Sequence, residues 1–246
     1  MIDIHCHILP DIDDGAESFE EALEMARMAA FTGVTEIIAT PHFQGEPDFL
    51  ELREDIHRRY LQLKEALEHW HIPVVLHEGA EVLCLPQTPE LARQKLLPTL
   101  GSSRYVLTEF FFNESFGYMD DCLAQIAACG YRPVVAHPER YDTVQRDPQR
   151  LQLWADRGYV LQLNKGSILG SLGARAEQAA NELLELGLAH LFASDAHSSY
   201  ARTPHMDNLI RWTEECCDPV CAEILLTENP YRILQDMPMA VLSEED

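Results

Sequence analysis

Short apolar runs alternate along the chain with segments whose apolar residues recur every three or four positions. Runs of the first kind are too short for helices and are typical of buried strands. They predict strands over residues 2–5, 35–40, 74–76, 80–83, 105–111, 132–136, 159–163 and 190–193.

The intervening segments have the period of amphipathic helices. Ser18, with Glu21 three residues later, has the spacing of a capping box, and Gly33 is a natural stop for the helix that follows it. The same period predicts further helices over residues 47–70, 119–129, 148–157 and 172–186.

Regular alternation of strand and helix predicts an α/β fold with a mostly parallel sheet that is closed or nearly closed. A length of 246 residues suffices for one barrel, and no linker, repeat or low-complexity tract divides the chain. We therefore expect a single barrel-like domain over residues 1–246.

The charge and the cysteines narrow the class of protein. With 18 basic and 41 acidic residues, the net charge of -23 disfavours nucleic acid and anionic membranes as partners. No apolar stretch approaches the roughly 18 residues that span a bilayer, and no signal peptide is visible, so we expect no membrane insertion. The seven cysteines are odd in number and include no Cys-x-x-Cys pair, which favours reduced thiols in the cytoplasm. We expect Cys216, Cys217 and Cys221 to be buried thiols on the last helices rather than a metal cluster.

A His-x-His pair ends the first predicted strand. Residues two apart on a strand point the same way, so His5 and His7 project together while Cys6 points away. Alone, the pair could equally be two histidines bonded to their neighbours.

Recurrence at later strand ends favours a metal site, because the carboxyl ends of parallel barrel strands meet at one face. Residues with metal-ligand chemistry follow one strand after another: His5, His7, Asp13, Asp14, His42, Glu81, Glu109, His137, Asp195 and His197. Glu109 stands in an apolar run, Val106–Phe111, where an unpaired carboxylate would be costly. A structural salt bridge would also explain it, but a bound cation explains it better.

Seven segments together resemble the PHP (polymerase and histidinol phosphatase) superfamily. They are His5–Gly15, Ala39–His42, Gly79–Glu81, Thr108–Phe110, Ala136–Arg140, Asn164–Ser167 and Ser194–His197, spread from residue 2 to about 205. The stretch from His7 to Asp13-Asp14-Gly15 is closest to the tyrosine-phosphatase branch, the manganese-dependent enzymes of bacterial capsule and exopolysaccharide operons.

The resemblance implies a distorted (β/α)7 barrel that holds three divalent metal ions. His5, His7, Glu81 and Asp195 would bind the first. Glu81 would bridge to a second, also held by Glu109 and His137, and Asp14, His42 and His197 would hold the third. Imidazole and carboxylate ligands suit Mn, Fe or Zn, and the resemblance favours Mn2+. It also implies hydrolysis of phosphotyrosine on the tail of a tyrosine autokinase that controls polysaccharide synthesis.

Clustered divalent ions generate hydroxide near neutral pH and clamp the attacking and leaving oxygens of a phosphate ester. Arg140 and Arg202 follow His137 and His197, and their guanidinium groups are candidates to hold the phosphate. Lys165 departs from the small residue that is common in the family, and we expect it to face solvent. No cysteine is followed by arginine six positions later, which disfavours a phosphocysteine mechanism.

Two alternatives differ in the class of function. One is another PHP phosphoesterase, acting on histidinol phosphate or on nucleotide ends. The other is a non-catalytic, metal-stabilised binding module, which a complete set of ligand residues disfavours. The sequence does not determine the oligomeric state.

Overall fold

The computed structural model describes residues 1–44 and 49–240. All pairs of named strands in these residues are parallel. One sheet has the order β1 (Ile2–Cys6), β2 (Glu36–Ala39), β4 (Val75–Glu78). The other has the order β3 (His42–Gln44), β5 (Glu81–Leu83), β6 (Tyr105–Glu109), β7 (Arg132–Ala136), β8 (Val160–Asn164), β9 (Leu191–Ala193).

The two sheets form one ring. β2 leads into β3 across Thr40 and Pro41, and β4 leads into β5 in the same way, so the pieces trace seven strands. The ring closes between β1 and the residues after β9, where His7 N donates to Ala196 O at 2.8 Å and Asp195 N donates to His5 O at 2.9 Å. The expected distorted seven-stranded α/β barrel is confirmed.

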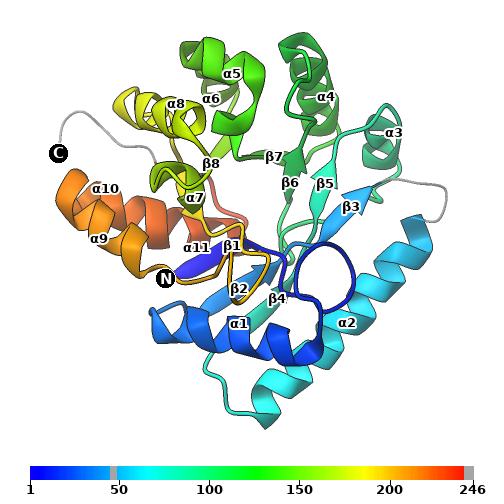
Figure 1. Ribbon diagram of the computed structural model, residues 1–246. Coiled ribbons are helices and arrows are strands. Elements are labelled where there is room, and N and C mark those ends of the chain that lie inside the picture. Colours follow the sequence, from blue (N-terminus) through cyan, green and yellow to red (C-terminus); the bar gives the residue numbers. More distant parts are fainter. Residues whose placement is uncertain (45–48, 241–246) are drawn as a thin grey trace.

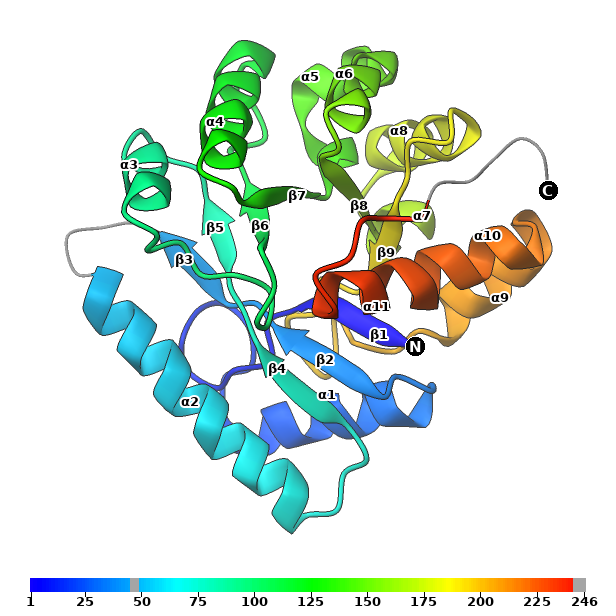
Figure 2. The same ribbon diagram turned by 180° about the vertical axis from the view of Figure 1, so that it is seen from behind.

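Helices surround the strands on the outside (Figures 1 and 2). Within the described residues, none combines the length and the apolar character that crossing a bilayer requires. The α-helices are α1 (Phe19–Phe31), α2 (Phe49–His69), α3 (Thr88–Arg93), α4 (Phe116–Ala128), α5 (Asp142–Arg146), α6 (Gln152–Asp156), α7 (Lys165–Ile168), α8 (Ala174–Glu185), α9 (Asp207–Cys216), α10 (Pro219–Glu223) and α11 (Asn229–Leu234). Short 3-10 helices lie at Pro138–Arg140 and Pro148–Leu151, and a π-helical turn lies at Ile224–Glu228.

An irregularity in β1 decides which of its side chains enter the barrel. Asp3 pairs with Ile37 and Cys6 pairs with Ala39, so β1 uses one residue more than β2 over this stretch. Ile2 and Ile4 pack in the cluster inside the barrel, whereas Cys6 packs in the cluster between the strands and the helices. This bulge shifts the alternation, so that the histidines beyond it also point into the barrel.

Most predicted elements are present with small shifts at their ends. Helix 47–70 is observed as α2, and its residues 47 and 48 lie outside the described part of the chain. The segment 148–157 divides into a 3-10 turn and α6, and β3 was not predicted. Ser18 Oγ accepts from Glu21 N at 3.2 Å, which is one half of the predicted capping box, while Glu21 Oε2 accepts from Glu17 N at 3.0 Å.

The expectation of three buried thiols near the C-terminal helices was wrong. Cys216 is exposed, and Cys217 and Cys221 are only half-buried. Cys216 ends α9 and Cys217 caps it, so these two thiols stand at a helix end rather than on an inward face.

Candidate metal centre

The imidazoles of His5 and His7 face each other inside the barrel. Their Nε2 atoms are 3.2 Å apart. His5 Nδ1 lies 2.9 Å from Gln162 Oε1, and His7 Nδ1 lies 2.8 Å from Asp13 Oδ2. Because amide and carboxylate oxygens only accept, both Nδ1 atoms donate and both Nε2 atoms are left to bind something else.

Two carboxylates lie beside these imidazoles. Glu81 Oε2 lies 3.3 Å from both Nε2 atoms, and Asp195 Oδ1 lies 3.5 Å from His5 Nε2 and 3.7 Å from His7 Nε2. All four side chains are buried. Ligands bonded to one tetrahedral cation at the usual lengths are separated by about 3.4 Å. The two imidazoles and Glu81 therefore have the spacing and the chemistry of one coordination sphere, while Asp195 groups with His5 and His137.

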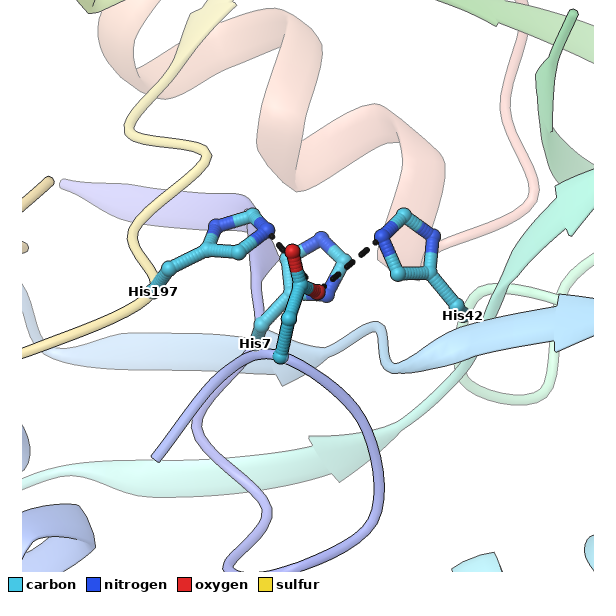
Figure 3. Close-up of side chains that lie close together, drawn as sticks. His7, His42 and His197 are labelled. Atoms are coloured by element: carbon cyan, nitrogen blue, oxygen red, sulfur yellow. Dashed lines mark ion pairs between the residues drawn. The ribbon is translucent and has the colours of Figure 1, made fainter. Parts of the chain in front are cut away.

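A second group opens toward solvent. Asp14 Oδ1 lies 3.3 Å from His42 Nε2 and 3.5 Å from His197 Nε2. His7 belongs to the same cluster of donor atoms, and Figure 3 shows the three imidazoles converging from different segments. His7 thus lies between the buried group and the exposed one.

Glu81 connects the buried group to a third. While its Oε2 faces His5 and His7, its Oε1 lies 2.9 Å from His137 Nε2. Glu109 Oε1 lies 2.9 Å from His42 Nδ1, so in this structure Glu109 contacts His42 rather than His137, with which the resemblance grouped it. The two oxygens of Glu81 have the placement of a bridging carboxylate.

Neighbouring carboxylates raise the pKa values of two histidines of the centre, His42 and His7. Burial alone would lower the pKa of His42, but hydrogen bonds with Glu109 and Glu81 outweigh it and raise the pKa to about 11. Burial likewise opposes the hydrogen bonds of His7 with Asp13 and Glu81, which raise its pKa to about 9. A cation bound here would displace these protons, since imidazole ligands bind metal in their neutral form.

Backbone strain marks the same strand ends. His137 follows β7 with φ of 35°, and Asp195 follows β9 with φ of 50°. Left-handed backbone is unfavourable for residues other than glycine, and such strain concentrates at functional sites. It turns both side chains from the strand ends toward the centre of the barrel.

In the Asp13-Asp14-Gly15 segment the two aspartates have different roles. Asp13 accepts from His7 Nδ1, from His42 N at 2.8 Å and from Gly15 N at 2.9 Å, so it supports two histidines. A Cβ on Gly15 would lie 2.1 Å from His7 O, which only glycine avoids. Asp14, one residue earlier, is left free to face His42 and His197.

Both predicted arginines reach Asp195 at the edge of the centre. Arg140 Nη1 lies 3.5 Å from Asp195 Oδ2, and Arg202 Nη2 forms an ion pair with the same oxygen. Burial would raise the pKa of Asp195, but His5, His137 and Arg202 outweigh it and lower the pKa to about 2. The two guanidinium groups are partly exposed, so an anion in solution can approach them.

The expectation that Lys165 faces solvent was wrong. Its side chain is buried, and Nζ donates to Thr203 O and, at 2.8 Å, to His205 O. Lys165 begins α7, and its ammonium group ties this helix to the loop that follows Arg202 through these two carbonyls.

Several supporting residues were missed by the sequence reasoning. Gln162 holds His5, and Asn164 Nδ2 donates to Asp195 Oδ2. Glu139 Oε1 in turn accepts from Asn164 N at 3.0 Å. Gln162 had the same signal as Glu109, a polar residue inside an apolar strand.

Comparisons with known proteins agree with this geometry. The model of the family described as "Capsular polysaccharide synthesis, CpsB/CapC" matches residues 1–235. Tyrosine-protein phosphatase YwqE of Bacillus subtilis is 34% identical over 96% of this chain and 92% of its own length. Tyrosine-protein phosphatase CpsB of Streptococcus pneumoniae is 32% identical over 96% and 99%.

Solved structures extend the likeness to three dimensions. A crystal structure described as that of YwqE from Bacillus subtilis and CpsB from Streptococcus pneumoniae, "unique metal-dependent tyrosine phosphatases", matches with a TM-score of 0.85 and 30% identity, over 99% of this chain and 100% of that chain. A lactonase from Listeria monocytogenes matches with a TM-score of 0.58 at 13% identity over 98% and 95%, which shows a shared fold alone. The resemblance that the motifs indicated is confirmed.

Proposed function

The chain belongs to the CpsB/CapC family of capsular polysaccharide synthesis proteins, and from that premise we propose that it is a metal-dependent protein-tyrosine phosphatase. One observation carries the proposal. Imidazole and carboxylate donors converge inside the barrel, and two arginines stand at the edge of the same cluster.

We assign three divalent ions to the centre, with Mn2+ favoured over Fe or Zn. The first would bind His5, His7, Glu81 and Asp195. The second would bind Glu81, Glu109 and His137, and the third would bind Asp14, His42 and His197. The spacing of His5, His7 and Glu81, the split contacts of Glu81 and the cluster around Asp14 support this grouping in part. The assignment of Glu109 to the second ion follows the resemblance, since Glu109 contacts His42 in this structure.

Divalent ions held here would supply Lewis acidity and lower the pKa of water. Arg140 and Arg202 both contact Asp195 Oδ2, so their fork-shaped donors converge on one point beside the ligands. A phosphate dianion placed there would take over these donors and be oriented by them. The protein's own contribution is therefore positioning and charge stabilisation, the main demands of phosphoryl transfer.

The cysteines take no part in this proposal. Burial raises the pKa of the Cys6 thiol well above its ordinary value, so Cys6 stays protonated between two ligand histidines. Its side chain packs in the cluster between strands and helices, away from the centre. This supports a mechanism without a phosphocysteine.

The substrate is proposed to be a phosphotyrosine-containing protein, the tail of a tyrosine autokinase that regulates polysaccharide synthesis. A cytoplasmic location belongs to the same proposal, and the free state of Cys6, Cys84, Cys122, Cys129, Cys216, Cys217 and Cys221 is compatible with it. We treat residues 1–246 as one PHP-type metallophosphatase domain.

The test compares four substrates with the manganese-loaded protein: a phosphotyrosine peptide, a phosphoserine peptide, histidinol phosphate and a 3′-ended oligonucleotide. We expect hydrolysis of the phosphotyrosine peptide, and its loss after chelation. Activity confined to histidinol phosphate or the oligonucleotide would replace the proposal by another phosphoesterase activity. Inactivity with Mn, Fe and Zn alike would favour a binding module.

A further inference from the structure

An exposed phenylalanine stands beside the proposed phosphate site. Phe112 follows β6, which carries Glu109, and its side chain is 44% exposed although its neighbour Phe110 is buried. Its ring centroid lies 4.3 Å from Arg140 Cζ and 6.0 Å from the ring centroid of His137. A phosphate-binding candidate and a ligand candidate therefore both touch this one ring.

The ring is held in place rather than loosely exposed. Phe112 O accepts from Asp142 N at 2.8 Å, and the ring meets that of Tyr141 at 6.3 Å between centroids. The hydroxyl of Tyr141 donates to Ala136 O at 3.0 Å and accepts from Phe110 N at 3.2 Å, which fixes this segment to the end of β7. A fixed, half-exposed aromatic ring at the rim of a polar centre is suited to contact a ligand.

We propose that Phe112 is a specificity-determining residue that receives the aromatic ring of the substrate. The inference rests on the proposed function and deepens it. In an aryl phosphate one ester oxygen separates the ring from the phosphoryl group, so the group that binds phosphate and the group that binds the ring must be neighbours. Arg140 and Phe112 are such neighbours. An alkyl phosphate offers no ring to this surface, so Phe112 discriminates between the two classes.

The effect of the proposed aromatic contact on ligand binding can be estimated. Aromatic pairs at ordinary separations add about two- to tenfold to an equilibrium constant beyond the area that they bury. Replacing Phe112 by leucine keeps an apolar side chain over Arg140 but removes the ring. We therefore expect aryl ligands to weaken by about tenfold, while phosphate, which contacts the arginines alone, changes little.

The experiment compares inhibitors that differ only in the ring. With manganese-loaded protein, phenylphosphonate, methylphosphonate and inorganic phosphate are measured against wild type, Phe112→Leu and Phe112→Tyr. For Phe112→Leu we expect the Ki of phenylphosphonate and the KM of a phosphotyrosine peptide to rise about tenfold, with the Ki of phosphate and methylphosphonate within about twofold. Phe112→Tyr retains the ring and should retain the aryl preference. Phe111→Leu, at a neighbour that is 54% exposed, is the matched control and should change none of these values.

Two results would overturn the inference. If all three inhibitors weaken by the same factor, Phe112 acts only by packing against Arg140. If none weakens, the ring does not contact the substrate. The same ligands can be compared by calorimetry without turnover, so a failure of the phosphatase proposal would not obscure this outcome.

Discussion

Replacing Gln162 by leucine tests whether His5 is oriented for a cation. Gln162 Oε1 and His5 Nδ1 are 2.9 Å apart, and both side chains are fully buried. Leucine removes the acceptor and leaves the Nδ1 hydrogen of His5 without a partner. The partner matters most when Nε2 is bound to a cation, because coordination makes the Nδ1 hydrogen a stronger donor.

The expected loss of Mn2+ affinity in Gln162→Leu can be worked out in two ways. Loss of such a partner typically weakens metal binding by about 10- to 100-fold, which is roughly 1.4–2.7 kcal/mol. An unpaired buried donor costs about 1–3 kcal/mol, which agrees. In the metal-free protein the change is smaller, because Gln162 Nε2 has no hydrogen-bond partner within the described residues and leucine removes that unpaired group. We expect the free energy of unfolding without metal to change by less than about 1 kcal/mol.

The assay is competition of the protein with a chelator for Mn2+, combined with denaturant unfolding in the absence of metal. Gln162→Glu is the control, because it retains an acceptor of nearly the same shape and should bind Mn2+ at least as tightly as wild type. If Gln162→Leu binds Mn2+ within about twofold of wild type while folding normally, His5 is not a ligand in the way that the geometry indicates.

Three further changes test other parts of the structure. Lys165→Met removes the donor to the Thr203 and His205 carbonyls, so Arg202 should hold phosphate less well and the Ki of inorganic phosphate should rise by about three- to tenfold; an unchanged Ki would contradict a positioning role. Gly15→Ala forces a Cβ against His7 O and should lower both thermal stability and Mn2+ affinity, whereas retention of both would mean that the loop can move away. Burial lowers the pKa of His190 below its ordinary 6.5, so the unfolded chain takes up a proton that the folded chain excludes and stability falls as pH drops below about 6.5; His190→Gln should flatten this slope between pH 7 and 5 in denaturant titrations, and an equal slope would refute the assignment.

Much of the architecture follows from local patterns. The alternation of apolar runs with amphipathic segments depends only on the periods of strand and helix, and it predicted the barrel and most of its elements. The ligand candidates could be predicted for a related reason. Parallel strands place their carboxyl ends on one face, so residues as far apart in the chain as His7 and Asp195 can be expected to meet there.

What the patterns could not supply are the contacts between distant side chains. Gln162 and His5 are 157 residues apart, and nothing local indicates that one holds the other. Lys165 was predicted from the sequence to face solvent, and only the folded structure brings the loop around Thr203 against it. The bulge in β1 changes which side chains enter the barrel, and it arises from pairing with β2 rather than from the residues of β1 alone.

The sequence by itself determined the kind of fold, the residue types of the centre and the family to which they belong. The tertiary structure alone decided that Asp13 supports His7 and His42, that Gln162 holds His5, that Glu109 contacts His42 rather than His137, and that Phe112 lies against Arg140. The physical reason is that periodicity sets the direction of a side chain along its own element, whereas its partner is set by the packing of elements that the chain brings together only on folding.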